Sequence, residues 1–170
     1  LPNSLTSIGD YAFSNCGVLE NVTLPNSLTS IGEYAFSNCN LKNITLPDSV
    51  TSIGEGAFYG TKLIDITIPE SVTYINKYTF RGCRALTNVR FPSTITFIGE
   101  SAFRECTSLT DITIPASANL DWWVFRDCSS LANVTLLNPD MYKWSSTLSL
   151  AFEGTPWLEN RKNNNDSNSG

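Results

Sequence analysis

The sequence predicts a repeat solenoid, built mostly from short parallel β-strands and short turns, and three observations predict it. A unit of 22 or 23 residues recurs six times, and each copy opens on an apolar residue followed by proline. Each unit closes on a short run in which apolar and polar residues alternate. Charged residues make up only 16% of the chain, whereas 41% of it is hydrophobic. One unit buries too little apolar surface to fold alone, so the units must stack around a continuous core.

Each unit begins with the same local pattern. After the apolar-Pro pair come an aliphatic residue, Thr, a variable residue, Ile and usually Gly, as in Leu5–Gly9. After two intervening residues come a small residue and Phe, as in Ala12–Phe13. The Gly predicts a turn, and the segment around Phe is too short for more than one or two turns of helix. The six opening pairs are Leu1-Pro2, Leu24-Pro25, Leu46-Pro47, Ile68-Pro69, Phe91-Pro92 and Ile114-Pro115.

The closing run of each unit predicts a strand. In the run Leu19–Leu24, Val22 and Leu24 share one face, so Asn21 and Thr23 must point the other way. The proline that follows cannot donate a ladder hydrogen bond, so it ends the strand at the same place in every unit. Successive strands are therefore expected to pair in parallel, about 4.8 Å apart.

The pattern divides the chain into three parts. Residues 1–135 hold the six repeats, residues 136–162 a degenerate repeat and a C-terminal cap, and residues 163–170 an apolar-free segment expected to be disordered. The cap is expected because Trp157, beside Pro156, replaces the repeat pattern where the last core layer must be covered. The chain starts inside a repeat, which is typical of a fragment or a mature segment. No run approaches the ~20 apolar residues of a membrane span.

Composition excludes several function classes. The net charge is -5, from 11 Lys plus Arg against 16 Asp plus Glu, so nucleic acid is not an expected partner. The chain has no histidine, which removes His-dependent triads and imidazole zinc sites. We expect neither a cofactor nor a metal, and no enzymatic activity. A glycosidase would need two carboxylates across a cleft; Asp65 and Asp111 lie two units apart on one predicted sheet, and no cleft is expected between them.

Five cysteines occupy one repeat position, which Thr61 fills in the third unit. Their even spacing along the repeats predicts a column of small buried thiols rather than a disulfide framework. A catalytic thiol is not expected, because it would need an activating base. The cysteines are Cys16, Cys39, Cys83, Cys106 and Cys128.

The outward residues of the predicted strands form two polar rows. Thr and Asn suit an exposed sheet, so the rows can be read as solvated surface or as a contact surface. Three Asn-x-Thr triplets of this sheet, at Asn21, Asn43 and Asn133, match the glycosylation acceptor pattern, as does Asn165 in the tail, but the repeat itself imposes the first three. One row is Asn21, Asn43, Asp65, Asn88, Asp111 and Asn133; the other is Thr23, Thr45, Thr67, Arg90, Thr113 and Thr135.

Aromatic and cationic residues concentrate toward the C-terminal half. The variable residue before Ile is Ser in the first three units, then Tyr74 and Phe97, and Trp122 takes a position that charged residues fill in the other units. Exposed aromatics and Arg are typical interface anchors. Arg81, Arg104 and Arg126 occupy equivalent positions, and acidic residues directly follow the last two. That column is either a cationic binding edge or a neutralised edge of ion pairs, each worth about 0–1 kcal/mol.

With its Phe, Cys and Leu at fixed offsets, the pattern over residues 1–134 resembles the BspA-type leucine-rich repeat family. The resemblance implies a right-handed, curved β/α superhelix with short helical turns. It also implies a place in cell-surface or extracellular proteins of bacteria and some protists, which bind proteins or attach to host surfaces. In that family the sheet lines the concave face, so its outward rows become the expected contact surface.

We therefore expect a non-catalytic module for protein binding or adhesion, with a protein or a host-surface macromolecule as partner. The alternative is a structural spacer within a larger surface protein. The exposed N-terminal layer also predicts self-association. The expected contact residues are Asn43, Asp65, Thr67, Asn88, Arg90, Asp111, Thr113, Tyr74, Phe97, Trp122 and Arg104.

Overall fold

A column of phenylalanine rings runs through the centre of the stacked coils. Each ring comes from the Ala-Phe position of one unit and lies nearly parallel to the next, with centroids 5.1–5.5 Å apart and planes within 13°. Offset parallel rings at this separation attract one another beyond the apolar area they bury. The computed structural model describes residues 1–143 and 145–166. The column is Phe13, Phe36, Phe58, Phe80, Phe103, Phe125 and Phe152, and all but Phe13 are fully buried.

The closing runs of the units form a parallel ladder, as predicted. This closing ladder consists of two strand pairs, β4 with β6 and β8 with β10, and an isolated bridge between Asn21 and Asn43 nearer the N-terminus. Along each strand the outward side chains alternate with the buried ones. The strands are β4 (Asp65–Thr67), β6 (Asn88–Arg90), β8 (Asp111–Ile114) and β10 (Asn133–Leu136).

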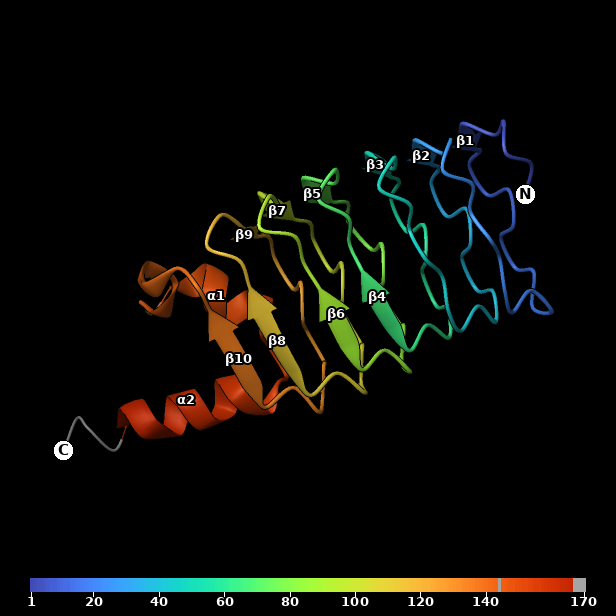
Figure 1. The fold of residues 1–170 in the computed structure, drawn as a ribbon. Helices are drawn as coiled ribbons and strands as arrows, with labels where there is room; N and C mark the ends of the chain where they lie inside the picture. Colours follow the sequence, from blue (N-terminus) through green and yellow to red (C-terminus); the bar gives the residue numbers. More distant parts are fainter. Residues whose placement is uncertain (144, 167–170) are drawn as a thin grey trace.

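A second parallel ladder, which the sequence did not predict, forms at the Thr-x-Ile segment of each unit. The opening ladder, as we name it, runs along the other side of the stack (Figure 1). Thr side chains reinforce it, since the Thr29 hydroxyl donates to the Thr6 carbonyl and that of Thr96 to Thr73. Its strands pair in two groups of three, with no strand pairing between the groups: β1 (Ser7–Ile8), β2 (Ser30–Ile31) and β3 (Ser52–Ile53), then β5 (Tyr74–Ile75), β7 (Phe97–Ile98) and β9 (Asn119–Leu120).

The segment around Phe forms turns, where short helical turns were expected. Residues 1–136 contain no helix. Most of these turns hold two residues with positive φ, such as Tyr34 and Asn38, which breaks any right-handed helical path. The amides of the turn point to the next coil instead, so Phe36 N–H donates to the Ala57 carbonyl at 2.8 Å.

The sequence predicted a turn at the Gly after Ile. In the structure this glycine instead allows two neighbouring coils to pack closely, because it has no side chain. Gly54 does not have positive φ, but a Cβ there would lie 2.5 Å from the Glu33 backbone nitrogen of the preceding coil. Gly32 and Gly99 meet backbone of the preceding coil in the same way. Gly9 belongs to the first coil, and a Cβ there would meet nothing within 4 Å.

The cysteine column is buried and reduced, as predicted. Cys39, Cys83, Cys106 and Cys128 are fully buried and Cys16 is half-buried. Each buried thiol donates to the carbonyl of the Phe in the preceding unit, for example Cys128 Sγ to Phe103 O at 3.1 Å. The column therefore joins neighbouring coils by side-chain hydrogen bonds as well as by packing.

Helices cover the last coil. A 3₁₀ helix, η1 (Pro139–Tyr142), and α1 (Ser146–Ala151) lie beyond β10, followed by α2 (Pro156–Asp166). Trp157 of α2 closes the phenylalanine column, 4.7 Å from Phe152. The guanidinium of Arg161 lies over the rings of both Tyr142 and Trp157, which ties α2 to η1.

The prediction of a disordered tail from residue 163 is wrong for residues 163–166, which continue α2. Pro156 and Trp157 start the helix, and extending an existing helix by one more residue requires little free energy, even when that residue is polar. Residues 167–170 of the predicted tail lie outside the described residues.

We predict that Gly54→Ala lowers the free energy of unfolding by about 1–3 kcal/mol, because the added methyl group overpacks against the backbone of the preceding coil. Gly9→Ala is the matched control, since it makes the same change where nothing is close. Urea unfolding followed by circular dichroism measures both. Equal stability of the two variants would contradict the role assigned to this glycine.

We also predict that stability falls as pH rises above 9. Burial raises the pKa of the Cys83 thiol from an ordinary 9.0 to about 11, and burial raises that of Cys106 as well. Between pH 9.0 and about 11 the unfolded chain loses a proton that the folded chain keeps on Cys83, so the free energy of unfolding decreases by about 2 kcal/mol from this thiol, and Cys106 acts in the same direction. Urea unfolding at pH 8 and at about pH 10.5 measures the loss.

The control for this titration replaces both thiols by the residue that the third unit uses. Thr61 fills the same position and its hydroxyl donates to the Phe58 carbonyl, so Cys83→Thr/Cys106→Thr should fold. This variant keeps every other titrating group and should lose less stability at high pH. An identical pH dependence in both proteins would show that the thiols do not contribute.

Candidate functional site

The outer face of the closing ladder holds the two predicted polar rows. Pairing places Asp65 beside Asn88 and Thr67 beside Arg90. Farther along, Asp111 pairs with Asn133 and Thr113 with Thr135. These side chains are exposed, except Asn88, which is half-buried. The structure thus brings seven of the expected contact residues onto one face: Asn43, Asp65, Thr67, Asn88, Arg90, Asp111 and Thr113.

Within the described part of the chain, the charged residues of this face have no ion-pair partner. Arg90 Nη1 lies 3.4 Å from Thr67 Oγ1, and Asp111 accepts a hydrogen bond from its neighbour Thr110 at 2.9 Å. Among the residues that the structure describes, neither Arg90 nor Asp111 forms a salt bridge. Their charges are therefore available to a ligand.

The closing ladder is interrupted between β6 and β8, and a hollow lies at the interruption. Strand pairing links β4 to β6 and β8 to β10, but not β6 to β8. Phe91 stands here at the position that Leu or Ile fills in the other units, and its larger ring meets Phe103 edge-on at 5.5 Å. The hollow has a volume of about 600 Å³. Its polar lining includes Asn88, Arg90, Asp111 and Thr113.

One apolar residue at the hollow was not predicted from the sequence. Leu137 lines the hollow and its side chain is 55% exposed. It occupies the position of the unit-opening proline, because the seventh unit begins with Leu136-Leu137. The missing proline was the signal that could have revealed it. Asp65 does not line the hollow, so the two aspartates considered for hydrolysis do not share it.

Tyr74 and Phe97 lie apart from this face. They are paired neighbours on strands β5 and β7 of the opening ladder. Their exposed fractions are 39% and 41%, as the sequence led us to expect. They form a small aromatic patch on another side of the coil.

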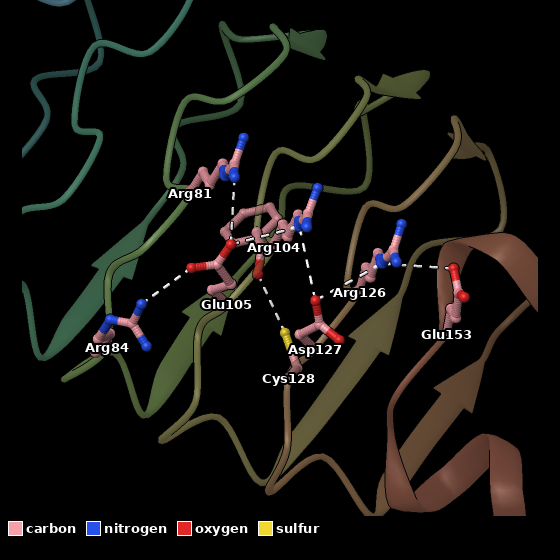
Figure 2. A network of polar contacts seen from close by, with 9 residues as sticks. Arg81, Arg84, Arg104, Glu105, Arg126, Asp127, Cys128 and Glu153 are labelled. Atoms are coloured by element: carbon pink, nitrogen blue, oxygen red, sulfur yellow. Dashed lines mark hydrogen bonds and ion pairs between the residues drawn. The ribbon is translucent and has the colours of Figure 1, made fainter.

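Trp122 and Arg104 belong to a third surface, the edge formed by the turns. Trp122 is 54% exposed and lies 6.2 Å from the ring of Trp123. Arg104 is shared between Glu105 and Asp127, with Nε 3.4 and 3.7 Å from their carboxylate oxygens. Figure 2 shows that the pattern repeats along the stack, and Arg126 in turn lies between Asp127 and Glu153. The expected contact residues are thus divided among three surfaces.

The N-terminal coil exposes part of its apolar layer. Leu1 is 46% exposed, while Leu5, Phe13 and Leu19 are only half-buried. Self-association through this coil stays a prediction.

Residues 1–143 and 145–166 also lack two other kinds of functional feature. No cluster of three or more His, Cys, Asp or Glu side chains in these ranges could hold a metal ion. No helix within them has the length and apolar character that crossing a membrane requires.

Comparison with solved structures defines the class as a leucine-rich repeat solenoid. A leucine-rich repeat protein from Bacteroides ovatus is 36% identical with a TM-score of 0.66, over 81% of this chain and 42% of its own. One from Eubacterium ventriosum is 27% identical with a TM-score of 0.65, over 92% of this chain and 45% of its own. A Treponema pallidum leucine-rich repeat protein is 28% identical with a TM-score of 0.50, over 79% and 56%. This chain therefore spans about half the length of these proteins.

The chain belongs to the BspA-type leucine-rich repeat family. The family model, described as a BspA type leucine rich repeat region, matches residues 1–64 and 51–167 and finds six copies. No curated protein matches the chain. The family and the similar structures indicate no catalytic class.

Proposed function

We propose that this chain is a non-catalytic module for binding or adhesion, part of a cell-surface or extracellular protein, and that a partner protein docks on the closing-ladder face around the hollow. The family supports a role in protein interaction at the cell surface. The observation that carries the choice of face is the hollow itself, where the unpaired charges of Arg90 and Asp111 lie near the exposed Leu137.

The chemistry of the hollow suits a protein surface. Its volume of about 600 Å³ can accept one or two side chains of a partner. Apolar lining from Val89, Ile112 and Leu137 gives an inserted side chain a desolvated contact. Arg90 and Asp111 can each pair with an opposite charge, which sets the orientation of the partner. Around the hollow, the uncharged Asn and Thr rows cost little to desolvate compared with charged residues.

We predict that Arg90→Ser and Leu137→Asp each weaken binding to such a partner by about 2 kcal/mol, or about thirtyfold, because they remove the cationic and the apolar contact of the hollow. Purified secreted and cell-surface proteins are arrayed and probed with the labelled chain, and the affinity of each protein that binds is then measured by biolayer interferometry.

The matched control is Val18→Asp, which makes an apolar-to-acid change at a fully exposed site in the first coil. It should leave the affinity unchanged. If the two hollow variants also bind with unchanged affinity, this face is not the docking surface. If no arrayed protein binds the chain at all, the spacer role is favoured instead.

A further inference from the structure

The hollow at the interruption of the closing ladder extends along the strands. Its lining comes from residues between 88 and 93 of one coil and between 111 and 117 of the next, and Leu137 of the following coil lies near one end. Along the chain this lining passes through several successive residues, whereas across the stack it involves neighbouring coils only. A ligand that fills the hollow therefore lies along the strand direction.

Three kinds of side chain occupy three successive outward positions of this face. Outward side chains alternate with buried ones, so outward positions are two residues apart along a strand. Asp111 holds the first outward position of β8. Arg90 belongs to the second, in the same row as Thr113. Leu137 holds the third, because it is the next outward residue after Thr135 of β10. The face thus presents an acid, a base and an apolar group in that order.

The charges at the first two positions are opposite and available. Arg90 and Asp111 are the charged residues among those that line the hollow. Asp65 makes the first position more negative, because it pairs with Asn88 on one side while Asp111 holds the equivalent position on the other side. At the second position, the residues of both coils next to Arg90 are threonines. Within residues 1–143 and 145–166, the Arg90 side chain has one hydrogen bond, to Thr67 at 3.4 Å, so its other N–H donors can bind a ligand.

A backbone donor faces the same gap between β6 and β8. The Arg90 carbonyl accepts the amide of Ile68, directly after β4, at 2.9 Å. Backbone groups of successive strand residues point to opposite sides, so the Phe91 amide faces β8. This amide donates to no backbone carbonyl in the described part of the chain. A carbonyl of a bound peptide can accept this hydrogen bond, as happens when a strand is added to a sheet edge.

From these contacts we infer that the hollow binds an extended peptide segment of the partner, with a basic, an acidic and an apolar side chain at alternate positions, as in Lys-x-Glu-x-Leu or its reverse. The assignment rests on the docking role proposed above for this face, and it specifies what docks there. Charge complementarity sets the order, with the base at Asp111, the acid at Arg90 and the apolar residue at Leu137.

The spacing of the outward positions suits an extended ligand. Same-face side chains of any β-strand are about 6.7 Å apart, so those of a bound strand stay in step with the outward positions of β8. A helical ligand would need the same three side chains three or four residues apart in its sequence. The sequence spacing of the ligand is therefore a direct test of its conformation.

Capped, fluorescently labelled peptides are the probes, with fluorescence polarisation as the measurement. Lys-Thr-Glu-Thr-Leu and Leu-Thr-Glu-Thr-Lys, each between Ser-Gly flanks, cover the two directions. For each direction, one control exchanges the two charged residues, a second uses the same residues without alternation, and a third spaces the three residues four apart. We expect one direction to bind at least about tenfold more tightly than its controls. If neither direction does, or if the helical spacing binds as tightly, the inference is wrong.

Charge reversal in the chain locates the contact. Arg90→Glu should weaken binding of the preferred peptide about tenfold or more, and a peptide with Lys in place of the central Glu should recover that loss on this variant. The matched control is Lys62→Glu, which makes the same change at an exposed lysine that does not line the hollow. It should change the affinity little. Equal losses in both variants, or no recovery with the exchanged peptide, would overturn the site.

A second exchange keeps the test decisive if Arg90→Glu fails to fold. Leu137→Asp should weaken the preferred peptide, and a peptide with Lys in place of its Leu should bind this variant more tightly than it binds the unaltered chain. Absence of that recovery would place the apolar residue of the peptide elsewhere and contradict the assigned order.

The peptide results and the docking of a whole partner protein can be told apart. If Arg90→Ser weakens a partner protein but no peptide shows the ordered preference, the hollow remains the docking surface and the extended peptide is rejected. If the ordered peptides bind and depend on Arg90 while a partner protein is unaffected by Arg90→Ser, the peptide site stands and the partner protein docks elsewhere.

Discussion

Backbone hydrogen bonds between successive coils are the interaction on which the rest of this structure depends. In the turns the amide of one coil donates to the next, as Phe80 does to Ala102 at 2.8 Å; in the opening ladder the direction reverses, as with Gly99 and Ile75. Each coil therefore satisfies many of its buried polar groups through its neighbours, in addition to the turn hydrogen bonds within the coil. The phenylalanine column, the thiol hydrogen bonds and the glycines at close contacts all require the same fixed spacing of the coils. That spacing in turn places side chains of equivalent positions in straight rows.

The surfaces with functional potential arise where the repeat is modified. Phe91 replaces an aliphatic residue where the closing ladder is interrupted, and Leu137 replaces a proline at the far side of the same hollow. At the turn edge, the residue after Phe changes from Ser in the first two coils to Arg in the fourth, fifth and sixth. Rows of identical small polar residues offer a partner no distinguishing contacts. The modified coils provide charge and apolar surface, and they lie together in the C-terminal half.

The fold could be predicted from the sequence because the same short pattern of alternating apolar and polar residues recurs in six units. A single alternating run such as Asn21–Leu24 is ambiguous, but six copies at one spacing specify a stacked parallel ladder. The opening ladder was missed because Ser7–Ile8 and its equivalents are too short for alternation to be recognised. The role of Gly54 was misread because a contact with the preceding coil leaves no local mark in the sequence. At the candidate site, the two outward polar rows could be predicted from the alternating pattern of the strands alone. The hollow could not, and neither could the separation of Tyr74 and Arg104 from the face of the closing ladder, because both depend on how the coils are arranged in space.

Native-state hydrogen exchange measured by NMR tests most directly whether each coil is held by its neighbours. The amides of Phe13 and Phe80 both donate to the next coil at 2.8 Å, so the local hydrogen bonds are alike. Within residues 1–143 and 145–166, the coil of Phe13 has a neighbour on one side only and Phe13 is half-buried, whereas Phe80 lies between two coils and is fully buried. If neighbours provide the stability, the Phe13 amide should exchange at least about a hundredfold faster than that of Phe80, since opening the end coil disrupts only one interface. Equal protection of the two amides would contradict this account.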